Sequence, residues 1–367
     1  MDVIKNWKSM STIQFCSMQL FELVYLLTLA FLPFVVAIRE ITYVIFAVLV
    51  FIVGIAVFKR CRAHTLNPLE KVVLITGCDT GLGNACARRL ESKGFTVVAA
   101  CYDDQSEGAS KLREITSGRL HVLKLDITDV NSIKNCFIKV KSLCDKRGLW
   151  ALINNAGTAS FGDIEFSTIE SFRKVLDVNL FGTVQITQAF LPLIRAAKGR
   201  VLTLTGSSGL LALPGQSALC MSKFGLEAFN DSLRQEMIPF GVNVITIRPG
   251  NFAGSTGLLN KSGLDKVKLS FEEMKNKANN EIKEIYGNNY MDSHYKQLCE
   301  LAKSTAKSLS NVVTAVEHAV GSQSPRSRYL VDGGNQLLDL GNTLIRLSPC
   351  LPYALHDLLV RKFYGYK

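Results

Sequence analysis

The chain has 367 residues, of which 48% are hydrophobic and 20% charged. These values exclude a disordered or collagen-like chain and are sufficient for one large domain or two small ones. The formal net charge is +11, but basic and acidic residues are interspersed. This pattern argues against nucleic-acid binding and favours a membrane surface or simple solubility.

The cysteines and histidines give no sign of a disulfide framework or a metal site. There are ten cysteines without a CxxC pair, and five histidines without a pair at metal-ligand spacing. Several cysteines lie within apolar runs, where a free thiol behaves as a small hydrophobic group. We therefore expect a reducing compartment for the folded part and no bound metal.

The first sixty residues account for the positive mean hydropathy of +0.19. Two apolar runs, 21–38 and 41–58, flank Arg39 and Glu40, and a basic cluster follows at 59–62. Each run approaches the roughly 20 residues that cross a bilayer as a helix. The apolar length and the lack of a small-residue cleavage site before the basic cluster argue against a cleaved signal peptide.

Residues 1–62 are therefore predicted to be a membrane anchor with one or two transmembrane helices. A single span over 41–58 stays open, but a hairpin that turns at Arg39 and Glu40 is favoured. The hairpin would place the amino-terminal lysines and the basic cluster on one side. The positive-inside rule makes that side the cytosol.

From residue 71 the pattern becomes regular, with short apolar runs alternating with amphipathic helical stretches. The runs predict strands at 71–76, 96–101, 120–125, 149–153, 201–205 and 242–247. Strands that alternate with helices in this way form an α/β fold with a doubly wound parallel sheet. Ligands of such sheets bind at the carboxyl ends of the strands, where the polar and glycine-rich segments lie.

The first of these segments is Thr76–Gly83, with the sequence TGCDTGLG, between a strand and a helix that runs to Lys93. Glycines in this position let the backbone approach a pyrophosphate, and the helix amino terminus offers unpaired N–H groups. The order of strand, glycine-rich turn and helix predicts a dinucleotide site.

The motifs TGCDTGLG, LDITD, NNAG, DVNLFGT and IRPGNF, in this order and spacing, resemble the short-chain dehydrogenase/reductase family over residues 70–335. The segments SKFGLEAFNDSLR and LPYALHDLLVRKFYG resemble the branch with 17-beta-hydroxysteroid dehydrogenase type 2, D-3-hydroxybutyrate dehydrogenase and microsomal retinol dehydrogenases. The resemblance implies a single Rossmann-type domain and a membrane-anchored, NAD(P)-dependent oxidoreductase acting on a lipophilic alcohol or ketone. It also implies the endoplasmic reticulum membrane, with the mitochondrial membrane as the alternative.

By the same resemblance, the cofactor would be bound by residues at the ends of successive strands. These are Gly77, Gly81, Leu82, Gly83, Asp126, Asn155, Ala156, Gly157, Lys223, Pro249 and Gly250. Asp103, near the end of the second strand, could accept a hydrogen bond from a ribose hydroxyl, and no basic residue lies between Gly94 and Lys111. This favours NAD, with NADP as the alternative.

The family's chemistry uses a tyrosine, a lysine four residues later, a serine and an asparagine. Asn179 and Lys223 match the asparagine and lysine, and Ser207 is the favoured serine, with Thr205 and Ser208 close by. Leu219 stands where the tyrosine is expected. A phenol from the Tyr286–Tyr290 region could replace it, and so could a different proton path.

Two further segments complete the predicted organisation. Residues 252–307 are expected to cover the substrate, and 336–367 form a helical tail. A cytosolic domain would leave the sequons at Asn230 and Asn260 unused. The sequence leaves open whether the protein forms a homodimer.

Two functions are compatible with the sequence. One is an oxidoreductase with an altered proton relay, and the other is a non-catalytic relative that binds the cofactor and serves as a binding or scaffolding protein.

Overall fold

The computed structural model describes residues 12–61, 66–115, 117–287, 289–334 and 339–364. The chain divides into two compact units, Met1–His64 and Thr65–Lys367. The tail predicted at 336–367 therefore lies only partly within the described residues.

The described part of the first unit is one helix, α1 (Thr12–Cys61). Within it, Leu20–Ile55 is long and apolar enough to cross a membrane. The favoured hairpin is wrong, because the helix continues through Arg39 and Glu40. These two residues favour helix, their side chains pair at 3.2 Å, and no glycine between the apolar runs provides a turn.

The second unit contains a sheet of seven strands, all parallel, in the order β3-β2-β1-β4-β5-β6-β7. The strands are β1 (Val72–Thr76), β2 (Thr96–Cys101), β3 (Leu120–Lys124), β4 (Ala151–Asn154), β5 (Arg200–Leu204), β6 (Asn243–Pro249) and β7 (Arg328–Val331). The first six agree with the predicted strands to within about two residues, and sequence analysis missed β7.

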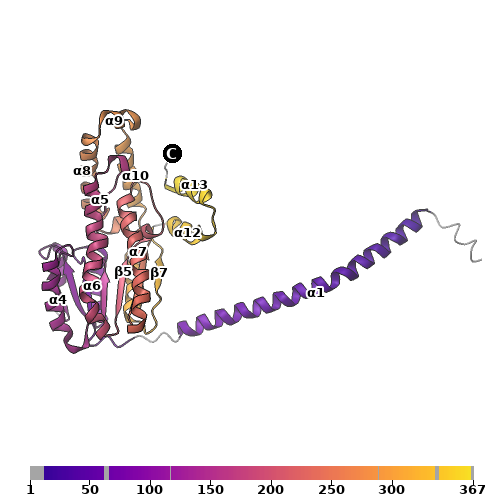
Figure 1. Cartoon of the computed structure of the whole chain (residues 1–367), viewed down its shortest axis with the longest axis horizontal. Helices are drawn as coiled ribbons and strands as arrows, with labels where there is room; N and C mark the ends of the chain where they lie inside the picture. The colour runs from indigo at the N-terminus through magenta and orange to yellow at the C-terminus, as the bar shows by residue number, and fades with distance from the viewer. Residues whose placement is uncertain (1–11, 62–65, 116, 288, 335–338, 365–367) are drawn as a thin grey trace, which may run out of the picture. The chain divides into compact units, whose positions relative to one another are not determined.

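Helices cover both faces of this sheet (Figure 1). One core contains side chains of α2 (Gly81–Ser92), α3 (Glu107–Arg113) and α11 (Ser310–Gly321). The other contains those of α4 (Val130–Cys144), α6 (Thr183–Ala196) and α7 (Ser217–Met237). Successive residues of β1 alternate between the two cores, which explains its unbroken apolar sequence. The predicted doubly wound, Rossmann-type fold is confirmed.

Six further helices complete the described part of the second unit. The first, α5 (Ile169–Leu176), is joined to α6 by a π-helical segment at Asp177–Gly182. Three helices, α8 (Lys261–Lys277), α9 (Asn280–Tyr286) and α10 (Tyr290–Lys303), gather at one end of the sheet (Figure 1). The last two, α12 (Leu340–Leu347) and α13 (Tyr353–Tyr364), share a small core formed by Leu211, Leu344 and Val360.

Six of the eight cysteines in the second unit are buried, and all eight are free thiols. Burial raises the pKa of four of them to about 12, namely Cys86, Cys101, Cys136 and Cys144. The sequon at Asn230 is also buried, and its Oδ1 accepts a hydrogen bond from Thr203 at 2.9 Å. Asn260 caps α8 through the N–H of Gly263. Burial therefore makes the Asn230 side chain inaccessible to modification in the folded unit.

Candidate functional site

A cavity of about 720 Å³ lies at the carboxyl ends of β1, β4, β5 and β6. Its lining includes Gly77 after β1, Asn155 after β4, Ser207 after β5 and Gly250 after β6. The chain leaves β1 and β4 in opposite directions along the sheet, so the cavity lies where α/β proteins bind their ligands.

The glycine-rich turn packs so closely that two of its glycines leave no room for a side chain. A Cβ on Gly83 would lie 2.3 Å from the carbonyl oxygen of Gly77 and 2.5 Å from Nδ2 of Asn155. A Cβ on Gly77, where φ is +69°, would lie 2.8 Å from Cα of Ala156. Packing of this loop against Asn155 and Ala156 therefore requires glycine at both positions.

The helix that follows begins with free N–H groups. Thr80 is the N-cap of α2, its side chain makes no capping hydrogen bond, and the first turn contains no acidic residue. Gly81 and Leu82 of that turn line the cavity. Because helix amino termini attract anions, this end of the cavity fits the pyrophosphate of a dinucleotide.

The loop after β4 is tied to the loop after β1. Asn155 Nδ2 donates to the carbonyl oxygens of Thr76 and Gly77 at 2.8 and 2.9 Å. The Thr76 hydroxyl accepts from the N–H groups of Asn155 and Ala156, both at 3.0 Å. Asn155, Ala156 and Gly157 line the cavity, and this network holds the floor of the cofactor end.

Of three acidic residues near the cofactor end, one lines the cavity and two do not. Asp79 lines the cavity, and its carboxylate accepts from the N–H groups of Tyr102 and Asp103 at 3.0 and 2.7 Å. Asp103 is exposed and does not line the cavity. Asp126 caps its own loop by accepting from Thr128 and is also outside the lining. Sequence analysis missed Asp79, although it lies inside the glycine motif.

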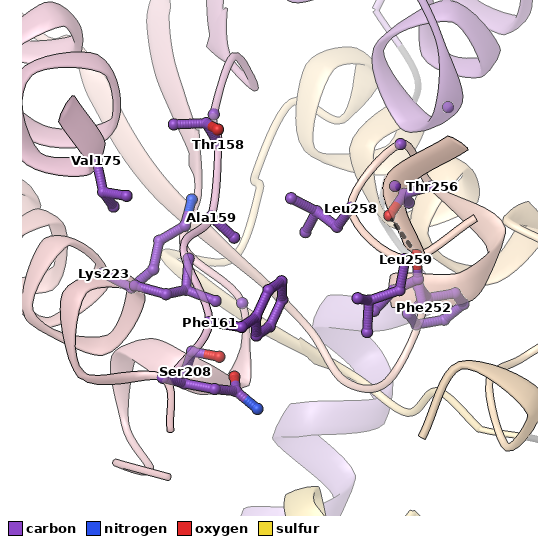
Figure 2. A pocket seen from close by; sticks show the side chains of 18 of the residues that line it. Thr158, Ala159, Phe161, Val175, Ser208, Lys223, Phe252, Thr256, Leu258 and Leu259 are labelled. Atoms are coloured by element: carbon purple, nitrogen blue, oxygen red, sulfur yellow. Dashed lines mark hydrogen bonds between the residues drawn. The ribbon is translucent and has the colours of Figure 1, made fainter. Parts of the chain in front are cut away.

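Lys223 extends from α7 into the cavity (Figure 2). Its Nζ donates to the carbonyl oxygen of Leu204 at 2.9 Å. A Cβ on Gly157 would lie 3.8 Å from that Nζ, so the ammonium group is beside the loop after β4. Loss of hydration lowers the pKa of Lys223 from 10.5 to about 8.

Of the three candidate hydroxyl residues, Ser207 and Ser208 remain available at the cavity wall. Thr205 also lines the cavity, but its hydroxyl donates to Glu227 at 2.7 Å. Glu227 in turn is held by two hydrogen bonds from Arg248, at 2.9 and 2.7 Å. This buried network fixes the Thr205 side chain and leaves the two serines as candidates.

Asn179 is fully buried in the π-helical segment between α5 and α6. Its side chain accepts from the N–H of Thr158 at 2.8 Å and donates to the Thr158 carbonyl and the Ser222 hydroxyl, both at 2.9 Å. Asn179 is not part of the cavity lining. It acts behind the wall, where it holds the loop after β4 against α7.

Leu219 lines the cavity one helical turn before Lys223. Its side chain is 7% exposed. The described lining contains four ionisable side chains, which are Asp79, Lys174, Lys223 and Lys266. A phenol is therefore absent from the described cavity wall.

The tyrosines proposed as substitutes are engaged elsewhere. The Tyr286 hydroxyl donates to Glu165, and the Tyr290 hydroxyl donates to Asp163 at 2.7 Å. Both rings pack against Phe166, and neither residue belongs to the described cavity lining. Their hydroxyls connect α9 and α10 to the loop after β4 and do not supply the missing phenol.

The other end of the cavity is apolar. Phe161 and Val175 lie on the same side as Lys223, while Phe252, Leu258 and Leu259 face them from the segment after β6 (Figure 2). Pro249 and Gly250 join this segment to β6 and also line the cavity. The site thus has one end suited to a dinucleotide and one suited to an apolar molecule.

The sequence comparisons agree with this geometry. A family model described as short chain dehydrogenase matches residues 71–266. The mitochondrial D-beta-hydroxybutyrate dehydrogenase of Bos taurus is 38% identical over 280 residues, covering 75% of this chain and 81% of that protein. Retinol dehydrogenase 7 of Mus musculus is 41% identical over 272 residues, covering 74% and 84%.

Among solved structures, a short-chain dehydrogenase/reductase from Burkholderia phymatum in complex with NAD superimposes with a TM-score of 0.62 at 19% identity. The match covers 80% of this chain and 96% of that one. A short-chain dehydrogenase from Streptomyces avermitilis gives a TM-score of 0.58 at 23% identity and covers 80% and 97%. These two show the shared fold. The family model and the two relatives establish that the chain belongs to the short-chain dehydrogenase/reductase family of oxidoreductases.

Proposed function

We propose that this chain is a membrane-attached, NAD(P)-dependent oxidoreductase that interconverts a steroid-like or other lipophilic alcohol and its ketone through an altered proton relay. The observation that carries the proposal is a single cavity lined by both the glycine-rich loop and Lys223. The apolar end of the same cavity, lined by Phe161, Leu258 and Leu259, adjoins them, and we call it the apolar chamber.

The cofactor end would hold the dinucleotide through the loop Gly77–Gly83, the N–H groups of α2, and Asn155, Ala156 and Gly157. A bound nicotinamide supplies a hydride acceptor or donor. Asp79 favours NAD, because its carboxylate at the end of β2 would repel a 2′-phosphate. NADP remains the alternative.

The proton would move through Lys223 and not through a phenol. In the oxidative direction the alcohol loses a hydride from its carbon and a proton from its hydroxyl, and becomes a ketone. Neutral Nζ of Lys223 would accept that proton, with Ser207 or a water as the connection. A pKa of about 8 gives Lys223 both protonation states near neutral pH, as a general acid or base requires.

The apolar chamber supports a lipophilic substrate. Its walls include Phe161, Leu259 and Val267, which are all buried. We infer that residues 252–307 cover the substrate, because part of this segment lines the cavity. The two relatives are named for retinol and D-beta-hydroxybutyrate, which favours alcohols of this general kind.

The apolar helix α1 supports attachment to a membrane. We propose the endoplasmic reticulum membrane, with the domain on the cytosolic side, where free thiols persist. The mitochondrial membrane is the alternative, since one relative is named as mitochondrial. A homodimer is compatible with the family.

One observation favours a second function. Leu219 can neither donate nor accept a proton, and a positioned general acid or base contributes roughly 10²–10⁴-fold to a rate. A chain that binds the dinucleotide without turnover would serve as a binding or scaffolding protein. The intact Lys223 in the cavity wall, with its pKa of about 8, favours the enzyme over this alternative.

The two functions separate in one experiment. The full chain in non-ionic detergent is titrated with NADH and NADPH, and then assayed with steroid alcohols, retinol and 3-hydroxybutyrate. The enzyme predicts turnover that Lys223→Met reduces at least about 100-fold. The matched control Lys268→Met changes an exposed lysine outside the cavity lining and should preserve the rate. Tight cofactor binding without turnover of any of these substrates would favour the binding protein.

A further inference from the structure

Two helices on the substrate side present the same kind of face to the cavity. The lining residues of α5 are Ser171, Lys174 and Val175, and those of α8 are Gly263, Lys266, Val267 and Ser270. Spacings of three and four residues place each set on one face of its helix. Each face combines an aliphatic side chain, a lysine and a hydroxyl.

Burial distinguishes the members of each face. Val175 and Val267 are 2% and 8% exposed, whereas Lys174 and Lys266 are exposed. Within the part of the chain that the structure describes, neither ammonium group forms an ion pair or hydrogen bond. The valines therefore form apolar wall, and the lysines carry uncompensated positive charge where the cavity opens to solvent.

The charge at the two ends of the cavity is unequal. The only anionic side chain in the described lining is Asp79, whose carboxylate is bonded to backbone N–H groups at the cofactor end. We call Lys174 and Lys266 the lysine rim of the cavity. In the described lining, no acidic side chain other than Asp79 is present to balance their charge. An apolar molecule with a negative group at one end would fit both the buried wall and this rim.

We propose that Lys174 and Lys266 select a lipophilic substrate that carries an anionic group, a carboxylate or its equivalent, at the end away from the reacting carbon. The inference rests on the proposed function in one respect, because it takes this cavity to be the substrate site. The hydroxyls of Ser171 and Ser270 add neutral donors beside the two ammonium groups.

The test uses the full chain in non-ionic detergent with saturating NADH. The probes are laurate and methyl laurate, which share an apolar chain and differ in charge. Binding of each is measured by calorimetry for wild type, Lys174→Gln, Lys266→Gln and the double variant. Each single change should weaken laurate binding about two- to fivefold, as expected for a solvent-exposed charge pair. Methyl laurate should bind all four proteins equally.

Three controls make the result specific. Lys268→Gln removes a lysine of α8 outside the lining and should leave laurate binding unchanged. Lys174→Arg keeps the charge and should retain most of the affinity. Raising the salt from about 50 to about 500 mM should weaken laurate binding to wild type more than to the double variant, because salt screens the rim.

The proposal is overturned if Lys174→Gln and Lys266→Gln leave laurate binding unchanged, or weaken both probes equally. It is also overturned if the changes spare laurate but reduce binding to phosphatidylserine vesicles, since the lysines would then contact a lipid surface. Turnover of 11-hydroxydodecanoate, whose secondary alcohol lies at the end of the chain opposite to the carboxylate, is measured in parallel with NAD as the cofactor. Charge-dependent binding without turnover would support the anion site and count against the proposed oxidoreductase, so the two failures are distinguishable.

Discussion

The two ends of the cavity differ in how tightly the fold constrains them. At the cofactor end, Asn155 Nδ2 donates to the carbonyl oxygens of Thr76 and Gly77 at 2.8 and 2.9 Å, and Gly77 and Gly83 leave no space for a Cβ. At the chemical end, Leu219 faces open cavity. Packing alone would retain the first set even without a ligand. The presence of the glycines therefore says less about activity than the identity of the residue at position 219.

The largest effect is expected from restoring a phenol. Leu219→Tyr should raise the turnover rate about 100-fold, the lower end of what a positioned general acid contributes. Leu219→Phe is the matched control, because it adds the ring without the hydroxyl. Steady-state rates of the two variants with the same alcohol provide the measurement. Equal rates for both would mean that Lys223 already completes the relay or that the hydroxyl is misplaced.

The cofactor end is tested by Gly83→Ala. The added methyl group would overlap the Gly77 carbonyl and Asn155 Nδ2, so we expect a loss of about 1–3 kcal/mol in stability. The distorted loop should also bind NADH at least about tenfold more weakly, a change of ~1.4 kcal/mol. Gly321→Ala is the control, since its Cβ would meet only Phe95 Cζ at 4.0 Å. Thermal unfolding with and without NADH measures both effects, and equal behaviour of the two variants would refute the packing argument.

The pH dependence should follow Lys223. Oxidation needs the neutral amine as proton acceptor, so its rate should rise as pH increases through about 8, and reduction should fall over the same range. Lys223→Arg should remove this inflection, because arginine stays charged. Rates in both directions between pH 6 and 10 would show it. A wild-type profile that is flat near pH 8 would exclude Lys223 as the titrating group.

The same group affects stability. The pKa of Lys223 is lower in the folded chain than its ordinary value of 10.5, so between about 8 and 10.5 the unfolded chain binds more protons. The free energy of unfolding should therefore rise with pH across this window relative to Lys223→Met. Denaturant titrations of both proteins at pH 7.5 and 10 would test the sign, and an opposite slope would contradict it.

The smallest effect concerns the choice of cofactor. Asp79→Asn should improve NADPH binding relative to NADH by about fivefold, since one charge near a 2′-phosphate is worth roughly 1 kcal/mol. Asp103→Asn is the matched change at an exposed acid outside the lining and should alter the ratio less than about twofold. Fluorescence titrations compare the two. A larger change in the NADPH-to-NADH affinity ratio for Asp103→Asn than for Asp79→Asn would identify Asp103 as the residue that selects the cofactor.

The regular part of the fold was predictable because buried parallel strands have unbroken apolar sequences, as in Val72–Thr76. The seventh strand, Arg328–Val331, was not, since it has four residues and begins with an exposed arginine. Hydrophobicity also could not decide between a hairpin and a continuous helix at Arg39 and Glu40. Both arrangements keep the same apolar residues in the helix.

Site residues could be predicted where a sequence motif fixes the backbone. They could be predicted less well where the direction of a side chain decides whether the residue lines the cavity. Ten of the predicted site residues line the cavity, whereas Gly83, Asp103, Asp126 and Asn179 do not. Asp79 was overlooked because its neighbours Asp103 and Asp104 are closer to the second strand in the sequence. The tyrosines at 286 and 290 could be tested only once their hydroxyls were seen to bond with Glu165 and Asp163.

The buried cysteines have a practical consequence for following motion in the second unit. A thiol whose pKa is about 12 has almost no thiolate at neutral pH and reacts slowly with alkylating reagents. The two cysteines of that unit that are not buried, Cys299 on α10 and Cys350 between α12 and α13, would take up a fluorescent maleimide first. Native chemistry thus offers one reporter on the helices beside the chamber and a second on the carboxyl-terminal segment, without any engineered label.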